Sequence, residues 1–276
     1  MNAEPRAVWR LIKTPPTHGA WNMAVDEAIL ESTSKSIHPP TLRLYAWEPA
    51  CLSLGYAQPA SDVDTSALQV HGWELVRRPT GGRAILHTDE LTYSVCGPDS
   101  DPILSGDILS SYKRISSAIL SALEHIGLGV QALPKEKEKP GAQPEPICFE
   151  VPSNYEITIQ GKKLVGSAQS RRIGGVLQHG TLPLTGDLTR ITQALVFPDE
   201  ASRQTAGERL LQRATTIESS LGTAISWDHA AEAFTTAFED VLHLDLQPSN
   251  LTPEELSRAE ELVATKYAHP DWNLRV

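Results

Sequence analysis

The sequence predicts an α+β fold in which helices flank a mixed, largely antiparallel sheet. Short apolar runs typical of strands follow one another between residues 41 and 95, and again between residues 155 and 184. No regular helical pattern separates neighbouring strands, which argues against a parallel sheet built from strand–helix–strand units. Helical patterns predominate in a C-terminal part that begins at about residue 187. With 276 residues and no internal repeat, the chain is expected to form a single domain over residues 1–276.

The N-terminal half opens with a helix and continues with several strands. The pattern MAVDEAILE over residues 23–31 predicts an amphipathic helix. Strands are predicted over residues 41–45, 51–56, 75–76, 84–87 and 91–95. Ile108, Ile115, Ile119 and Leu123 recur at helical spacing, and Gly127 is suited to end that helix.

The second half predicts three further strands and two helices. Strands over residues 155–160 and 163–169 are joined by a turn at Gly161, and another strand covers residues 176–184. Residues 227–242 have a helical pattern, and the capping box at residues 252–255 opens a helix to about residue 266. Residues 134–146 (PKEKEKPGAQPEP) are charged, rich in proline and without apolar anchors, so this segment is expected to be mobile.

Composition and charge argue against several classes of function. The net charge of −10 disfavours a nucleic-acid-binding protein. No apolar run approaches the ~20 residues of a membrane span, and no apolar leader opens the chain. Of the three cysteines, Cys51, Cys96 and Cys148, none has the spacing of a zinc site. We expect a monomeric cytoplasmic protein with reduced thiols, no bound metal, and no nucleic-acid or membrane partner.

The most distinctive stretch is RRPTGGRAILH, residues 77–87. Its two adjacent glycines, Gly81 and Gly82, allow a close approach of backbone or ligand where a Cβ atom would clash. Three arginines bracket the glycines: Arg77, Arg78 and Arg83. His87 ends the stretch. A glycine-rich turn among cations is suited to hold an anionic or strongly polar group.

Cys148 is the candidate nucleophile. It follows the segment predicted to be mobile, where reactive loops are often found. It also precedes predicted strands that carry Lys163 and His179. A lone cysteine is more often a small buried apolar residue. That interpretation is favoured for Cys51 and Cys96, which lie within apolar strand patterns.

Two further motifs are GKKLVGSAQ, residues 161–169, and QHGT, residues 178–181. Lys163 precedes a run of small residues, 166–168, that would permit a ligand to approach closely. A lysine there could direct its ammonium group at a carbonyl oxygen or a phosphate. On its own, the first motif also fits a solvated turn with two lysines at the sheet edge. His87 and His179 likewise also fit purely structural hydrogen bonding.

Taken together, these motifs resemble those of the biotin/lipoate protein ligase family. The RRPTGGRAILH, GKKLVGSA and HGT stretches occur in the order and spacing of that family. Residues 22–28 (NMAVDEA) resemble its first helix. The resemblance extends from about residue 20 to residues 261–273 and implies that residues 1–276 are a catalytic domain of the type found in this family.

Departures from the family patterns favour one branch. Arg83 stands where ATP-dependent lipoate ligases usually carry a third glycine. Val176 stands where another octanoyltransferase branch carries its cysteine, three residues before the His-Gly pair. Cys148, in a Cys-Phe-x-x-Pro-Ser context, together with the RPTGGR run, resembles the cysteine-dependent octanoyltransferases that load the glycine-cleavage H protein.

The resemblance implies a reaction that needs no cofactor. Octanoyl would pass from acyl carrier protein to Cys148 as a thioester, and then to a lysine of an apo-lipoyl domain, in H protein or in E2 subunits. Lys163 is implied to stabilise the oxyanion. The residues implied to line the acyl site are Arg78, Thr80, Gly81, Gly82, His87, Gly166, Ser167, Ala168, His179 and Gly180. Basic clusters around residues 77–83 and 162–172 would meet the acidic surfaces of both partner proteins.

Three alternatives remain open. One is an ATP-dependent lipoate or octanoate ligase that acts through an acyl-adenylate, against which Arg83 and Cys148 both weigh. A second is the sister amidotransferase, which takes octanoyl from H protein to E2 lipoyl domains and differs in the sequence around Arg83. A third is a non-catalytic acyl-binding module, which would need neither Cys148 nor Lys163.

Overall fold

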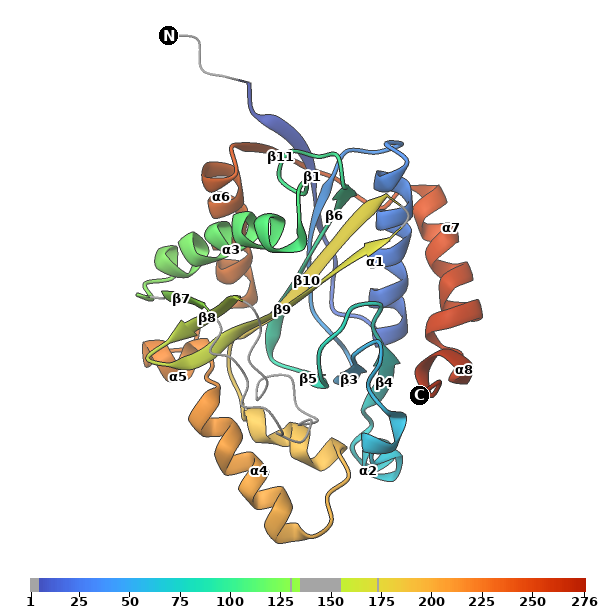
Figure 1. Ribbon diagram of the computed structural model, residues 1–276, viewed down its shortest axis with the longest axis vertical. Coiled ribbons are helices and arrows are strands. Elements are labelled where there is room, and N and C mark those ends of the chain that lie inside the picture. The colour runs from blue at the N-terminus through green and yellow to red at the C-terminus, as the bar shows by residue number, and fades with distance from the viewer. Residues whose placement is uncertain (1–4, 130, 135–154, 173) are drawn as a thin grey trace.

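The computed structural model describes residues 5–129, 131–134, 155–172 and 174–276, and its main feature is an eight-stranded sheet (Figure 1). The strands lie in the order β11-β1-β2-β6-β10-β9-β8-β7. Their bounds are β1 Ala7–Lys13, β2 Thr41–Tyr45, β6 Glu90–Pro98, β7 Gln131–Pro134, β8 Tyr155–Ile159, β9 Lys162–Arg172, β10 Gly175–Pro183 and β11 Leu244–Pro248. β1 pairs in parallel with β11 and β2, and the other neighbouring pairs are antiparallel. The predicted α+β fold with a mixed, largely antiparallel sheet is confirmed.

Helices cover both faces of this sheet. The pair α3 (Ile108–His125) and α6 (Trp227–Val241) packs on one face, and the pair α1 (Gly19–Ser34) and α7 (Pro253–Leu262) packs on the other (Figure 1). Successive strand residues alternate between the two cores. Leu42 and Leu44 of β2 join the α3–α6 core, whereas Tyr45 joins the α1–α7 core. Because both faces are covered, every residue of β2 and β10 is buried.

A smaller sheet of three strands stands beside the large one. β3 (Cys51–Leu54) pairs in parallel with β4 (Glu74–Arg77) and antiparallel with β5 (Ile85–His87). Leu52 and Leu54 pack with Ile191 and Leu210 in a third core, which brings in α4 (Glu200–Arg213) and the 3₁₀ helix Leu188–Ala194. The shorter helical elements are η1 Ala60–Asp62, α2 Thr65–His71, α5 Ile217–Leu221, the π-helical turn Val263–Tyr267 and α8 Pro270–Asn273.

Two local predictions from turn and cap chemistry are confirmed. Gln160 and Gly161 join β8 to β9 with φ angles of 51° and 76°, the left-handed pair that a two-residue hairpin turn requires. At the start of α7 the Thr252 hydroxyl accepts a hydrogen bond from the Glu255 amide, and the Glu255 carboxylate accepts one from the Thr252 amide. The capping box therefore forms as its sequence predicts.

Other features differ from the sequence prediction. β1 was not predicted, because Arg10 interrupts its apolar pattern; the Arg10 guanidinium is buried in a two-bond ion pair with Glu255 of α7. The C-terminal part that was predicted to be helical also contributes β11, a short edge strand next to β1. The strand predicted over residues 51–56 ends at Leu54, because the Tyr56 amide turns away to donate to the Thr80 carbonyl.

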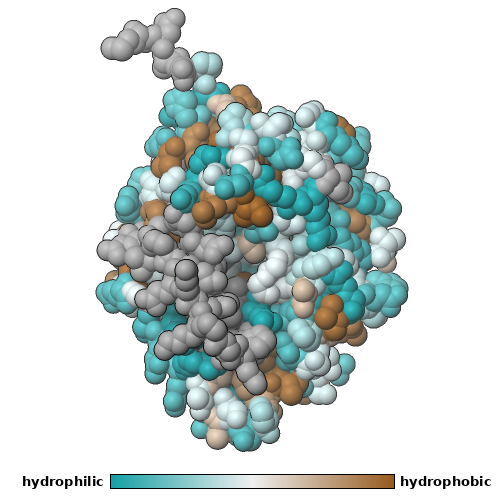
Figure 2. All heavy atoms as spheres, in the orientation of Figure 1, coloured by the Kyte–Doolittle hydropathy of each residue, from teal (hydrophilic) through white to brown (hydrophobic). Residues whose placement is uncertain are grey.

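Within the described ranges, no helix is both long enough and apolar enough to cross a bilayer. The face shown in Figure 2 is mostly hydrophilic, with hydrophobic residues in small separate groups.

Candidate active site

A cavity of about 270 Å³ lies between the small sheet and strands β9 and β10 of the large one. Its walls come from segments far apart in the sequence: α1, β2, the loop after β4, β5, β9 and β10. The residues that line it are Met23, Tyr45, Trp47, Ser53, Arg78, Gly81, Gly82, Arg83, Ile85, His87, Thr92, Lys163, Gly166, Ser167, Ala168, Gln169, His179, Gly180 and Thr181.

The structure brings most of the predicted site residues together in this cavity. Those that line it are Arg78, Gly81, Gly82, His87, Lys163, Gly166, Ser167, Ala168, His179 and Gly180. Thr80 is not part of the lining but holds His179 through a hydrogen bond. Cys148 and the segment of residues 135–146 lie outside the described residues. The Lys163 side chain is only 3% exposed, so the edge-lysine alternative does not apply to it.

Two glycines of the cavity wall are required, Gly180 by close packing and Gly82 by its backbone conformation. A Cβ atom on Gly180 would lie 2.5 Å from the Ser167 hydroxyl and 2.7 Å from the Tyr93 ring. Gly82 has a φ angle of 93°, which residues with side chains rarely adopt. Larger residues at these positions would displace β9 or the loop after β4.

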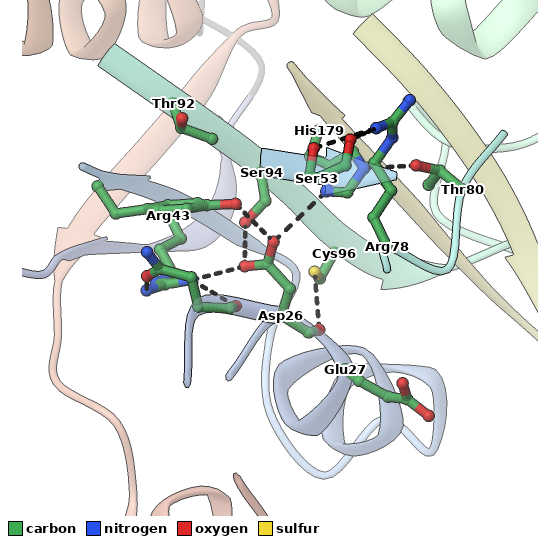
Figure 3. A network of polar contacts seen from close by, with 12 residues as sticks. Asp26, Glu27, Arg43, Ser53, Arg78, Thr80, Thr92, Ser94, Cys96 and His179 are labelled. Atoms are coloured by element: carbon green, nitrogen blue, oxygen red, sulfur yellow. Dashed lines mark hydrogen bonds and ion pairs between the residues drawn. The ribbon is translucent and has the colours of Figure 1, made fainter. Parts of the chain in front are cut away.

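A buried polar network centred on Asp26 of α1 supports one wall of the cavity (Figure 3). The Arg43 guanidinium lies 2.8 Å from one carboxylate oxygen of Asp26, and the Ser94 hydroxyl donates to the same oxygen at 2.8 Å. The Tyr45 hydroxyl donates to the other oxygen at 2.9 Å, and His179 Nδ1 lies 3.6 Å from it. The network joins α1 to strands β2, β6 and β10.

The electrostatics of this network define the state of His179. Burial alone would raise the pKa of Asp26, but Arg43 and His179 outweigh it and hold that pKa below its ordinary value. Burial lowers the pKa of His179, so its ring is neutral at pH 7. The network assigns the proton to Nδ1, facing Asp26, which leaves Nε2 to accept from the Thr80 hydroxyl at 2.6 Å.

His87 anchors a second polar network at the cavity. Its Nδ1 lies 2.7 Å from Glu90, its Nε2 lies 2.7 Å from the Ser53 hydroxyl, and its ring stacks on Trp47 with centroids 4.0 Å apart. Burial alone would raise the pKa of Glu90, but His87 and neighbouring hydroxyl groups hold it below its ordinary value. Both ring nitrogens of each histidine therefore face protein partners, as structural hydrogen bonding would have it, while the rings line the cavity.

Two of the arginines that bracket the glycine pair, Arg77 and Arg78, do not serve as anion-binding cations, which corrects the sequence interpretation for them. The Arg77 side chain is fully buried and donates to backbone carbonyls of the loop after β3 and of the C-terminal segment. Arg78 donates to the carbonyls of Ser53, Gly81 and Arg83. Both hold backbone in place, so neither offers its charge to the surface of a partner.

Sequence reasoning missed several residues of the site. They are Asp26, Tyr45, Trp47, Ser53 and Glu90. Asp26, Tyr45 and Ser53 lie inside segments predicted simply as helix or strand, and Trp47 and Glu90 lie just outside predicted strands. For Asp26 a signal existed, since an acidic residue stands on the apolar side of the predicted helix 23–31. In the parts of the chain that the structure describes, no three His, Cys, Asp or Glu side chains gather as metal ligands would.

Replacement of His179 by Gln is expected to weaken the dependence of folding stability on pH. Because the native pKa of His179 is lowered, the unfolded state binds more protons as pH falls below about 6.5, so the stability present above that pH is progressively lost. One such group changes the free energy of unfolding by at most ~1.4 kcal/mol per pH unit. Urea unfolding at pH ~7.5 and ~5.5 measures the effect.

The control for this comparison is His229→Gln, which alters an exposed histidine at the start of α6. This variant should keep the pH dependence of the wild-type protein. An equal loss of stability at low pH in the wild type and in His179→Gln would contradict the assignment.

Comparison with known proteins agrees with this geometry. The family profile described as "Lipoyl protein ligase A/B catalytic domain" matches residues 18–239. Two similar proteins are named octanoyltransferase LipM: that of Brevibacillus brevis is 43% identical, covering 97% of this chain and 99% of its own length, and that of Kyrpidia tusciae is 41% identical, covering 97% and 98%.

A solved structure extends the likeness to the fold. It comes from an archaeal lipoylation system of Thermoplasma acidophilum, described as a bi-partite lipoate protein ligase and its E2 lipoyl domain. The two chains superpose with a TM-score of 0.79 at 28% identity, over 98% of this chain and 97% of the other. Cavity, fold and sequence therefore agree, and the chain belongs to the lipoyl protein ligase A/B catalytic domain family.

Proposed function

We propose that this chain is an octanoyltransferase of protein lipoylation that works through a thioester on Cys148. It is an acyltransferase like its octanoyltransferase relatives, to which it is similar over nearly its whole length. The octanoyl group comes from acyl carrier protein and goes to a lysine of an apo-lipoyl domain, that of the glycine-cleavage H protein or of E2 subunits. The observation that carries this proposal is the buried Lys163 in a narrow cavity walled by glycines and apolar side chains.

The reaction proceeds in two balanced steps. The Cys148 thiolate attacks the carbonyl carbon of the donor thioester, and the thiol of the carrier arm leaves as the new thioester forms. The neutral amine of the acceptor lysine then attacks the acyl-enzyme. The amide bond forms, the Cys148 thiolate leaves, and the proton of the amine passes to solvent or base. Because a thioester is converted into an amide, the second step is downhill and no ATP is required.

The cavity supplies binding energy for the acyl chain. Met23, Trp47 and Ile85 present apolar surface to it, and burial of each methylene contributes ~0.8 kcal/mol. The backbone of the Gly81–Gly82 pair allows the chain to pass close to the loop after β4. The volume of about 270 Å³ suits one chain of medium length rather than a bulky ring system.

Lys163 is suited to stabilise the oxyanion. It is the second residue of β9, its backbone is fixed by a hydrogen bond from the Thr215 amide to its carbonyl, and its side chain lines the cavity. An ammonium group held there in a water-poor environment acts on the developing charge without reorganisation. The same charge would lower the pKa of a nearby cysteine thiol and raise the thiolate fraction.

The structural comparison raises one rival activity, and the position of Arg83 weighs against it. The chain shares its fold with a lipoate protein ligase at a TM-score of 0.79, so an ATP-dependent ligation must be considered. Arg83 lines the cavity at the place where the ligases usually carry a third glycine. Its side chain would reduce the room for a nucleotide there.

Replacement of Cys148 by Ala is expected to abolish acyl transfer. Wild-type protein incubated with octanoyl-carrier protein, without ATP, should gain one octanoyl group that hydroxylamine removes, as seen by intact-mass spectrometry. Cys51→Ala and Cys96→Ala serve as controls, because both thiols are buried and burial raises their pKa well above its ordinary value. Labelling and transfer by Cys148→Ala would refute the nucleophile assignment. Acylation that requires ATP and free octanoate would establish the ligase instead.

Replacement of Lys163 by Ala should reduce the rate constant of acyl-enzyme formation by about 100-fold or more, as for loss of one oxyanion donor. Lys162→Ala is the matched control, since the neighbouring lysine bonds the Leu211 carbonyl at the surface. Single-turnover acylation monitored by mass spectrometry separates the two variants. Equal rate constants of acyl-enzyme formation for Lys163→Ala and Lys162→Ala would show that Lys163 does not stabilise the oxyanion.

A further inference from the structure

We infer that Arg172 and Arg275, stacked around Tyr56, form the docking site for the phosphodiester and acidic surface of the acyl carrier protein. This inference rests on the proposed function, because it concerns how the donor reaches the cavity. It goes further by locating the donor on one surface of the molecule.

The cluster is assembled from three distant segments. The Arg275 guanidinium lies 3.8 Å from the centroid of the Tyr56 ring and 4.2 Å from that of Trp272. The Arg172 guanidinium, at the end of β9, lies 4.7 Å from the Tyr56 ring. Tyr56 itself is 37% exposed. Two planar cations are thus held on one partly exposed aromatic side chain.

The two charges are not neutralised by the described protein. Among the described residues, no carboxylate lies within 4 Å of either guanidinium. A third cation beside Trp272, Lys266, is by contrast paired with Glu27. Asp271, the acidic residue of the same C-terminal segment, lies against His269 instead. In a chain of net charge −10, two arginines without a carboxylate partner among the described residues attract an anion locally.

The guanidinium groups also keep donors for a ligand. An arginine has five N–H donors. Arg172 gives one hydrogen bond to the Pro79 carbonyl at 3.2 Å, and Arg275 gives one to the Tyr56 carbonyl at 2.8 Å. Stacking on the Tyr56 ring orders both groups in advance, which lowers the entropy that binding would otherwise cost. The pKa of Tyr56 is lowered by Arg275 and Arg172, as expected next to two cations.

The cluster adjoins the exposed wall of the cavity. Arg172 bonds Pro79, and the Tyr56 amide bonds the Thr80 carbonyl at 2.8 Å. The next two residues, Gly81 and Gly82, are exposed and line the cavity. An anion on the arginine pair would therefore sit beside the cavity and not inside it.

The chemistry of the donor fits this position. Its thioester is joined to the carrier protein by a long flexible arm that ends in a phosphodiester, so the anion stands away from the reacting carbonyl. Arginine forks bind phosphate oxygens through paired hydrogen bonds. The acceptor, by comparison, brings a lysine side chain and no phosphate to the site. The arginine pair is thus matched to the donor.

The experiment compares two donors on the double variant Arg172→Ala/Arg275→Ala. Octanoyl-carrier protein carries the phosphodiester and the acidic surface, whereas octanoyl-pantetheine carries neither. We expect KM for octanoyl-carrier protein to rise by about tenfold, with kcat little changed and with less dependence on salt than in the wild type. Kinetics with octanoyl-pantetheine should be those of the wild type, which also shows that the variant is folded.

Arg6→Ala is the matched control, since Arg6 is a half-exposed arginine that is paired with Asp240 away from the cavity. It should leave KM for octanoyl-carrier protein unchanged. An unchanged KM for octanoyl-carrier protein in the double variant overturns the inference. An equal fall in kcat/KM with both donors overturns it too, because the arginines would then serve to hold the loop.

The acceptor is tested separately by chasing preformed acyl-enzyme with apo-lipoyl domain. If the double variant has a raised KM for the lipoyl domain and an unchanged KM for octanoyl-carrier protein, the arginine pair binds the acceptor and the inference is overturned. The wild type is tested first. If it accepts no acyl group from carrier protein, the proposed function itself fails, and the inference fails with it for that separate reason.

Discussion

The burial of the Asp26 carboxylate is the constraint on which the rest of the site depends. A carboxylate enclosed by protein is tolerated only if charges and hydrogen bonds replace the water it has lost. Here the partners come from three strands of the large sheet: Arg43 and Tyr45 of β2, Ser94 of β6 and His179 of β10. Removal of one partner from such a buried pair typically costs about 3–5 kcal/mol. Helix α1 and the sheet must therefore close together in one register.

His179 connects the buried Asp26 network to the cavity. Its Nε2 accepts the Thr80 hydroxyl, so the polar core of the large sheet fixes the loop that carries Gly81 and Gly82. The loop is held from its other side by Arg77, whose guanidinium bonds carbonyls of the C-terminal segment. This wall of the cavity is thus held between the large sheet and the C-terminal segment. Arg77 and Arg78 use their guanidinium groups to hold backbone carbonyls around the cavity.

The sequence predicted the parts of this arrangement that depend on local chemistry. The fold class, the Gln160–Gly161 hairpin turn and the capping box at Thr252 each follow from patterns within a few residues. The gathering of the glycine pair, Lys163 and His179 in one cavity was implied by the resemblance to known ligases. What could not be predicted depends on contacts between distant segments. Arg77 and Arg78 look like ligand-binding cations until their carbonyl partners are known.

β1 and Asp26 illustrate the same limit. Arg10 makes the sequence of β1 look unlike a buried strand. The strand is explained only by the ion pair of Arg10 with Glu255, which lies more than two hundred residues later. Asp26 reads as one polar residue on a helix, although it organises the site. In both cases a charged residue within an apolar pattern belongs to a buried ion pair, and the sequence does not indicate which residue is its partner.

In the proposed reaction the octanoyl group is bound covalently to Cys148 between the donor thioester and the acceptor lysine. Rapid-quench kinetics with radiolabelled octanoyl-carrier protein and apo-lipoyl domain, without ATP, test it most directly. We expect label to appear first on the enzyme. The labelled enzyme should form and decay at least as fast as label appears on the lipoyl domain. Label that reaches the lipoyl lysine with no enzyme-bound intermediate, or only when ATP is added, would contradict it.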